Sequence, residues 1–148
     1  MRALVQRITR AKLSVDGKEI SSCGKGLIVY FGVKKGDTEK ELDFVVNKVA
    51  NLRVFEDENG KMNLSVKDVC GEIMSVSQFT LYGDVKKGFR PSFTEAEEPQ
   101  KASAIYDEFC DRLEKEGIKV ARGIFGADMQ IEYVNDGPVT IYVEKESV

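Results

Sequence analysis

The segment LIVYFGV at residues 27–33 is an unbroken apolar run of strand length. A run this short, without polar alternation, is typical of a strand buried on both faces near the middle of a sheet. Residues 3–15 precede it and also favour a strand, and Asp16-Gly17 then predicts a hairpin turn with a short return through Ile20. The rest of the fold is therefore expected to build outward from residues 27–33.

Two amphipathic helices are predicted further along the chain. The first follows a capping box, Thr38-Glu39-Lys40-Glu41, whose Thr and final Glu side chains suit the caps of a helix start. The second begins at Pro99, which fits the first position of a helix, and ends at Gly117. Their apolar faces recur at helical spacing and comprise Leu42, Val45, Val46, Val49 and Leu52 in the first helix, and Ala102, Ile105, Tyr106, Phe109 and Leu113 in the second.

Short strands complete the prediction, at residues 53–55, 72–80, 118–120, 129–134 and 139–143, with a long polar loop at residues 82–98. Two helices cannot cover both faces of so many strands. We therefore expect a single α/β domain over residues 1–148, with mixed, largely antiparallel, curled sheets and both helices packed on one face, in α/β/β layers.

The overall composition limits the possible classes of protein. The net charge is −3, so binding to RNA would need a local basic patch or recognition by shape. No apolar run approaches the ~18 residues that span a membrane, and residues 1–7 carry charges where a signal peptide is apolar. Cys23, Cys70 and Cys110 are far apart, which favours reduced thiols. We expect a cytoplasmic protein without membrane contact.

The chain contains no histidine. This absence excludes a Ser-His-Asp triad, a Cys-His pair and every His-based metal site. The sequence also has no Cys-x-x-Cys pair. Any chemistry must therefore use other groups, and we expect neither a metal nor an organic cofactor.

Residues Ser77-Gln78-Phe79-Thr80 end a predicted strand and lead into the long loop. Strand ends are places where a rigid scaffold presents backbone N–H groups and hydroxyls to a ligand. An ordinary strand end explains the same residues, and from the residues alone it is the better explanation, because the two hydroxyls have no base beside them in the sequence.

Residues Asn135-Asp136-Gly137-Pro138 separate the last two predicted strands and are interpreted as a tight turn. A plain hairpin is the simplest explanation. The Gly-Pro pair is less usual, because it joins a permissive residue to a locked one, and about 5–6% of X-Pro bonds in folded proteins are cis. Such a turn leaves the Gly137 and Pro138 carbonyls pointing outward, available to a ligand.

The basic residues that merit attention are Arg7 in the first strand and Lys86, Lys87 and Arg90 in the long loop. The loop cations surround Phe89, and cations beside an aromatic ring suit phosphate and base contacts. A solvated surface loop is nevertheless the commoner explanation. Arg7 is either the polar partner of a buried loop or a solvated side chain.

Six blocks of residues occur in a fixed order along the chain, at residues 52–57, 60–65, 77–82, 90–93, 125–129 and 135–140. In this order they resemble the D-aminoacyl-tRNA deacylases. The residues at the amino terminus, 1–7, also fit, and the resemblance extends over essentially the whole chain. Departures from the family pattern occur at Cys70, Gly83, Val85, Phe89 and Arg122, outside the motifs at 77–82 and 135–140.

The resemblance implies hydrolysis of the ester that joins a D-amino acid to the 3′-terminal ribose of tRNA, without metal or cofactor. It also implies a homodimer with its active sites at the subunit interface. In such a dimer, Gly137 and Pro138, joined by a cis bond, reach into the partner's site as a chiral filter. Their carbonyls reject an L side chain sterically, a filter that glycine would pass.

The resemblance assigns the catalytic positions to Ser77, Gln78, Phe79 and Thr80. Backbone N–H groups around Phe79 and Thr80 can form an oxyanion hole, and the ribose 2′-OH can help to position water. Direct attack by the Thr80 hydroxyl ranks second, because no base is evident beside it. Gln78 would position the strand end, while Phe79 and Met129 would pack on the terminal adenosine.

The remaining assignments concern binding. Arg7 would anchor the Gly-Pro turn, and Asn135 would belong to the same substrate-binding group. Lys86, Lys87 and Arg90 would contact tRNA. Two other functions stay open on the sequence alone: a non-catalytic RNA-binding module, which explains the basic loop but gives the Gly-Pro turn no role, and an esterase for small D-amino-acid esters.

Overall fold

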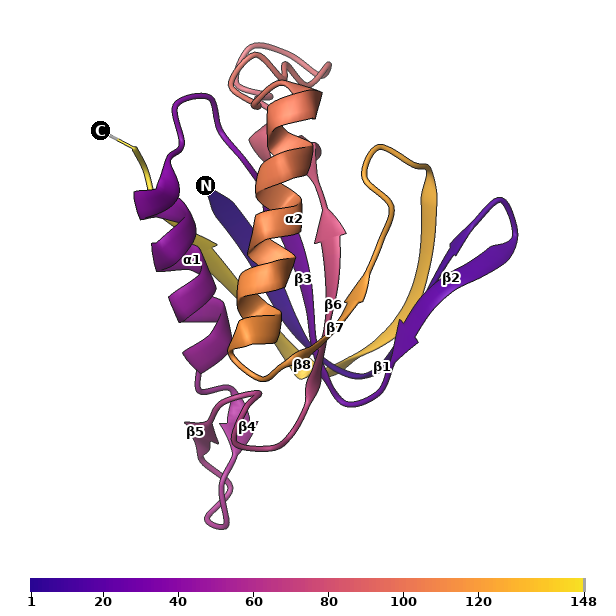
Figure 1. Cartoon of the computed structure of the whole chain (residues 1–148), viewed down its shortest axis with the longest axis vertical. Coiled ribbons are helices and arrows are strands. Elements are labelled where there is room, and N and C mark those ends of the chain that lie inside the picture. The colour runs from indigo at the N-terminus through magenta and orange to yellow at the C-terminus, as the bar shows by residue number, and fades with distance from the viewer. Residues whose placement is uncertain (148) are drawn as a thin grey trace.

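The computed structural model describes residues 1–147 (Figure 1). The strands are β1 (Arg2–Val15), β2 (Lys18–Cys23), β3 (Gly26–Gly32), β4 (Phe55–Glu56), β5 (Met62–Leu64), β6 (Glu72–Ser77), β7 (Lys119–Arg122) and β8 (Met129–Glu144). The helices are α1 (Glu39–Asn51), the short 3₁₀ helix η1 (Phe79–Tyr82) and α2 (Pro99–Lys115).

Six strands form one mixed sheet in the order β2-β1-β3-β6-β7, with β8 also paired to β1. Strand β1 is antiparallel to β2, β3 and β8, whereas β6 is parallel to both β3 and β7. The central, buried position predicted for residues 27–33 is confirmed, since every residue of β3 except Tyr30 is buried. The remaining two strands, β4 and β5, form a separate hairpin.

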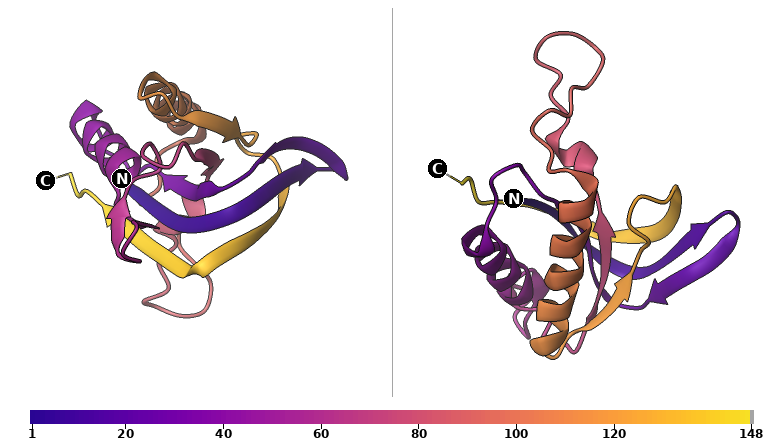
Figure 2. Two further views of the ribbon diagram at one scale, coloured as in Figure 1. Left: turned by 90° about the horizontal axis from the view of Figure 1, so that it is seen from below. Right: turned by 45° about the horizontal axis from the view of Figure 1, so that its top comes forward.

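Both long helices lie side by side on one face of the sheet, as predicted (Figures 1 and 2). The capping box at Thr38 is present, Pro99 is the first residue of α2, and Gly117 has a positive φ of 87° directly after that helix. The larger core cluster lies between the helices and the sheet, where the rings of Phe31 and Phe109 stack with centroids 4.1 Å apart. No helix within residues 1–147 is long and apolar enough to cross a membrane.

The sheet is strongly curled (Figure 2). A second, smaller core cluster is separate from the helix-covered one and draws its residues from β1, β3 and β6: Ile8, Ala11, Leu13, Ile28, Met74 and Val76. Partly buried side chains of β8, among them Met129 and Tyr133, pack against it. The homodimer and the stacking of two sheet layers stay predictions.

Three predictions of strand bounds are wrong. The strand expected at residues 53–55 begins only at Phe55 and extends to Glu56. The strand expected at residues 72–80 ends at Ser77, where the chain turns into η1. The two strands expected at residues 129–134 and 139–143 are one continuous strand, β8. Both halves of β8 pair with β1 in one direction, so the residues between them form a bulge instead of a hairpin turn.

Candidate active site

The strand β6 ends where its parallel pairing with β3 ends, at the register pair Phe31 and Ser77. The backbone N–H of Gln78 still donates to the Phe31 carbonyl at 2.8 Å, and the chain then folds into η1. Gly32 allows this close turn, because a Cβ there would lie 2.9 Å from the Gln78 carbonyl oxygen and 3.3 Å from the Leu81 side chain. Local packing thus fixes the position of the motif.

The first turn of η1 leaves backbone donors open. The N–H groups of Leu81 and Gly83 donate to the carbonyls of Gln78 and Thr80. Within residues 1–147, the N–H groups of Phe79 and Thr80 have no recorded acceptor, as the start of a helix requires, and Gln78 provides no side-chain cap. The Gln78 side-chain amide instead donates to Thr80 Oγ1. Two adjacent backbone donors without an acceptor in the described residues therefore lie beside the hydroxyl of Thr80, and both Phe79 and Thr80 are exposed.

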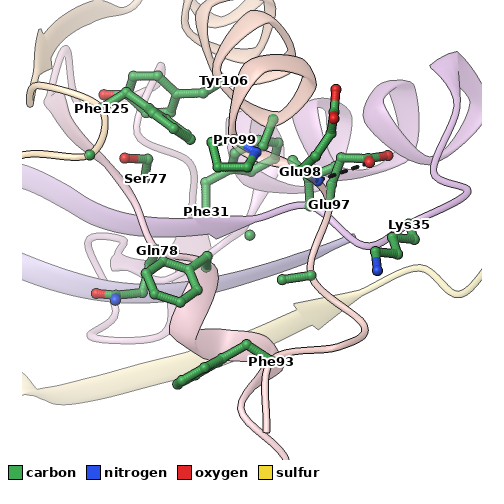
Figure 3. A pocket seen from close by; sticks show the side chains of 16 residues that line it. Phe31, Lys35, Ser77, Gln78, Phe93, Glu97, Glu98, Pro99, Tyr106 and Phe125 are labelled. Carbon is green, nitrogen blue, oxygen red and sulfur yellow. Dashed lines mark hydrogen bonds between the residues drawn. The ribbon is translucent and has the colours of Figure 1, made fainter.

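A cavity of about 420 Å³ adjoins this turn (Figure 3). Aromatic rings supply much of its wall, with Tyr106 and Phe125 at one end and Phe93 at the other. Its lining comes from the end of β3, the 77–79 segment, the long loop, the start of α2 and the loop before β8: Phe31, Gly32, Val33, Lys35, Ser77, Gln78, Phe79, Phe93, Ala96, Glu97, Glu98, Pro99, Ala102, Tyr106, Phe125 and Gly126.

A second cavity of about 280 Å³ shares Ser77, Gln78 and Phe79 with the first. Its other walls come from Val76, from residues 125–129 and from Ile131. Met129, which we expected beside the adenosine with Phe79, lines this smaller cavity and not the larger one. Residues 77–79 therefore separate two neighbouring hollows.

Tyr106 connects the three segments that surround these cavities. Its hydroxyl donates to the Ser75 carbonyl at 2.7 Å and accepts the Gly123 N–H at 3.2 Å. Burial raises the pKa of this hydroxyl far above its usual range, so it remains a donor. No sequence signal indicates this role, because Tyr106 also fits the apolar face of α2. Its two bonds tie β6, just before Ser77, to the loop that carries Phe125.

The Gly137-Pro138 pair lies in the bulge of β8. Ile8 pairs with Asn135 and Gln6 with Thr140, so a single residue of β1, Arg7, lies opposite residues 136–139. The bond between Gly137 and Pro138 is cis, and both residues are exposed. Gly137 has a φ of 125°, and a Cβ there would lie 2.9 Å from Val139 Cγ2 and 3.2 Å from Arg7 Nη2. Glycine is the residue that this backbone accommodates.

Arg7 lies directly behind the bulge and is buried, with 7% of its surface exposed. Its Nη1 donates to the Val54 carbonyl at 2.7 Å, and its Nε lies 3.3 Å from Asp136 Oδ2. Asn135 closes the bulge from within, since its Oδ1 accepts the Val139 N–H at 3.3 Å. Of the two interpretations of Arg7, the structure places it as the polar partner of a buried segment.

The candidate residues thus fall into three places. Ser77 to Thr80 border the cavities, with Met129 beside the smaller one. Gly137, Pro138, Arg7 and Asn135 form the bulge and line neither cavity. Lys86, Lys87 and Arg90 are exposed in the long loop. Within residues 1–147 no cluster of three or more His, Cys, Asp or Glu side chains could hold a metal ion.

Comparison with known proteins identifies the family of this chain. Residues 4–144 match the family model described as D-Tyr-tRNA(Tyr) deacylase. The chain belongs to this family. A D-aminoacyl-tRNA deacylase of Magnetococcus marinus is 55% identical over 145 residues, which cover 97% of this chain and 96% of that protein. The D-aminoacyl-tRNA deacylase of Aquifex aeolicus is 52% identical over 148 residues, the full length of both.

Two solved structures share the fold of this chain. The structure titled c-Myc DNA Unwinding Element Binding Protein is 47% identical and superposes with a TM-score of 0.92, over 99% of this chain and 100% of that chain. A probable eukaryotic D-amino acid tRNA deacylase has the same fold, with a TM-score of 0.82 at 20% identity over 96% of this chain and 97% of that chain.

Proposed function

We propose that this chain hydrolyses the ester between a D-amino acid and the 3′-terminal ribose of tRNA, releasing the free amino acid and the tRNA. The observation that carries the proposal is the pair of open N–H groups of Phe79 and Thr80 beside an aromatic cavity of about 420 Å³, in a chain that belongs to a deacylase family.

The larger cavity receives the terminal adenosine. Its volume is in the range of small-ligand sites, and its lining of Phe31, Phe79, Tyr106 and Phe125 suits a flat base. Phe79 lines both cavities, so it contacts the adenosine and also borders the neighbouring space. Met129 then contacts the part of the substrate that extends into the smaller cavity.

The chemistry proceeds through a tetrahedral oxyanion stabilised by the N–H groups of Phe79 and Thr80. Each such donor contributes roughly 10²–10³ in rate. Water, positioned with the help of the substrate's 2′-OH, attacks the ester carbonyl. The tetrahedral intermediate then breaks the bond between the carbonyl carbon and the ribose 3′ oxygen, which leaves as the 3′-OH with the proton given up by the water. The Thr80 hydroxyl is a poor nucleophile here, because its neighbour is the Gln78 amide N–H, a donor that cannot remove a proton.

Chiral selection uses the Gly137-Pro138 bulge of a second copy of the chain. The bulge is exposed and lines neither cavity of its own chain, which supports a role in the partner's site of a homodimer. D and L substrates carry the same functional groups and differ only in which Cα substituent faces the filter. Backbone carbonyls placed where an L side chain would go exclude it sterically and admit glycine.

The direct test measures release of amino acid from matched D- and L-aminoacyl-tRNA by the purified protein. We expect turnover of the D substrate and none of the L substrate. A short D-amino-acid ester without ribose serves as the control substrate. Binding of tRNA without turnover would show a non-catalytic RNA-binding module, and equal turnover of the short ester would show an esterase for small D-amino-acid esters.

A further inference from the structure

Residues 83–97 form an arm that projects beyond the body of the molecule above the start of α2 (Figures 1 and 2). Its base is held firmly. Asp84 and Ser92 exchange two backbone hydrogen bonds of 2.8 and 2.9 Å, and the Glu97 N–H donates to the Val33 carbonyl at 3.0 Å. The segment between Asp84 and Ser92 is therefore a tip presented on a fixed stem.

The tip combines an open ring with unpaired cations. Phe89 is fully exposed and Val85 is 60% exposed. Lys86, Lys87 and Arg90 make no ion pair with any residue in the part of the chain that the structure describes. No acidic residue occurs between positions 85 and 94. On a chain with a net charge of −3, this tip is a local positive patch around an aromatic ring.

The stem connects the tip to the candidate active site. Phe93, on the stem, lines the larger cavity, and its ring meets that of Phe79 edge-on with centroids 5.0 Å apart. The chain packs closely against the Phe93 ring at Gly83, where an added Cβ would lie 3.1 Å from a ring carbon. The rings of Phe79 and Phe93 therefore connect the candidate active site to the stem, and the chain leads from the stem to the exposed Phe89 at the tip.

We propose that the arm tip binds the unpaired nucleotides that precede the terminal adenosine of the substrate, with Phe89 stacked on a base and the cations on phosphates. The inference rests on the proposed function. Phe89 is four residues from Phe93, so the two lie at most about 14 Å apart. A stacked strand advances about 3.4 Å per nucleotide, so the distance from Phe93, which lines the cavity, to Phe89 at the tip corresponds to at most about four nucleotides.

The chemistry favours a single strand over other polyanions. Unpaired bases stack on exposed aromatic rings whatever their sequence, while a paired helix hides its base faces. An anionic membrane would also attract cations beside a ring. The continuity of the tip with the cavity through Phe93 favours RNA, and the membrane is an outcome of the test.

The first test uses Phe89→Trp, which creates the only tryptophan of the chain. The probe is a non-acylated RNA hairpin with an acceptor stem and an unpaired 3′ end. The control hairpin carries abasic sites in place of the nucleotides before the terminal adenosine, and anisotropy of a labelled end reports binding of both. At saturation, we expect the intact hairpin to quench the tryptophan fluorescence and the abasic hairpin to leave it unchanged.

Three results of this test would overturn the arm proposal. The first is binding of the intact hairpin without quenching. The second is equal quenching by the abasic hairpin. The third is a spectral change with anionic phospholipid vesicles and none with RNA.

The second test separates the arm from the active site. With Phe89→Ala, we expect kcat/KM for D-aminoacyl-tRNA to fall roughly 5- to 150-fold, the usual effect of losing one stacked base, and kcat/KM for D-aminoacyl-adenosine to stay unchanged. Met62→Ala is the matched control, since Met62 is a 51% exposed apolar side chain in the separate β4–β5 hairpin. It should leave both values unchanged.

The two substrates also separate failure of the arm from failure of the proposed function. Equal losses on both substrates with Phe89→Ala, or no loss on either, would contradict a role for Phe89 in RNA binding. If the wild-type chain turned over neither substrate, the proposed function itself would fail.

A third test addresses the cations. Replacing Lys86, Lys87 and Arg90 by Gln should flatten the slope of log affinity against log salt by about 0.7 per lost phosphate contact, so by about 2 in the triple variant. The control variant replaces three other lysines by Gln: Lys18, Lys40 and Lys115. All three are exposed and form no ion pair within residues 1–147. If the slope of log affinity against log salt were equal in the two variants, the three cations of the arm would not contact RNA phosphates, and the proposal would be wrong.

Discussion

The segments 77–80 and 135–140 both interrupt regular strand structure, but they do so in opposite surroundings. The first follows the end of a central strand and lies between two cavities built by its own chain. The second is a bulge inside β8, opposite the single residue Arg7, with Gly137 and Pro138 exposed. Segment 77–80 therefore borders space for a ligand, whereas segment 135–140 exposes Gly137 and Pro138 at the surface.

This difference matches the two tasks of the proposed enzyme. Hydrolysis needs donors fixed beside a cavity that holds the substrate, which one chain provides at Phe79 and Thr80. Chiral rejection needs only a rigid obstacle, which a second chain can insert. The comparison therefore predicts that changes in segment 77–80 alter the rate for every substrate, whereas changes in segment 135–140 alter the ratio of D to L turnover.

The largest expected effect on that ratio comes from Gly137→Ala. The new Cβ would lie 2.9 Å from Val139 Cγ2 at a φ of 125° that side chains rarely adopt, so the bulge must shift. Strain of this kind costs about 1–3 kcal/mol, and we expect the D to L ratio of kcat/KM to fall roughly tenfold or more. Gly60→Ala, also at positive φ but with open space around it, should leave the ratio unchanged.

The matched change beside the other segment is Gly32→Ala. Its Cβ would lie 2.9 Å from the Gln78 carbonyl, so it should displace the η1 turn and lower the rate on D substrate without admitting L substrate. If Gly32→Ala changed the D to L ratio as strongly as Gly137→Ala, the division of tasks between the two segments would be wrong.

Arg7→Ala should have the next largest effect. It removes a charged donor from the buried Val54 carbonyl and the cation beside Asp136. A hydrogen bond of this kind is worth about 1.5–3 kcal/mol, and we expect denaturant unfolding to show a loss of that size together with a lower D to L ratio. Arg10→Ala, whose side chain is 61% exposed, should change stability by less than about 0.5 kcal/mol.

Thr80→Ala should have a smaller effect. The backbone donors of η1 survive the substitution, so we expect the rate on D-aminoacyl-tRNA to stay within about tenfold of wild type, far above the uncatalysed level, given that each retained donor contributes roughly 10²–10³. Trapping an acyl-Thr80 intermediate on the wild-type protein would show that the hydroxyl is the nucleophile and would reverse the order of the two mechanisms.

The smallest effect should come from chelation. Because the residues described here form no cluster of metal ligands, extensive treatment with a chelator should leave the deacylation rate unchanged. Loss of activity with chelator and its recovery with added zinc or magnesium would contradict a cofactor-free mechanism for segment 77–80.

Much of the fold could be predicted from local signals. The apolar run at residues 27–33, the capping box at Thr38 and the Pro99 helix start each depend on neighbours in sequence, and each was confirmed. The bulge at residues 135–138 could not, because a hairpin turn and a bulge share the same local Asn-Asp-Gly-Pro chemistry. Only the pairing of both flanks with β1, more than 110 residues away, distinguishes them.

Only part of the candidate site could be predicted, again because some of its features depend on contacts between distant parts of the chain. The family resemblance indicates residues 77–80, but the predicted strand extends three residues beyond the end of β6. That end depends on Phe31 and Gly32 of the neighbouring strand β3. Tyr106 was assigned to the apolar face of a helix. Its hydroxyl bonds to Ser75 and Gly123 become visible only when three distant segments are brought together.

The most direct test compares deacylation of D-alanyl-, glycyl- and L-alanyl-tRNA by the same preparation under one condition. A filter that acts only by steric rejection at Gly137 and Pro138 cannot exclude glycine, which has hydrogen in both positions on Cα. We therefore predict turnover of D-alanyl- and glycyl-tRNA and resistance of L-alanyl-tRNA. If glycyl-tRNA proves as resistant as L-alanyl-tRNA, selection works by binding the D side chain, and the role given to the bulge is wrong.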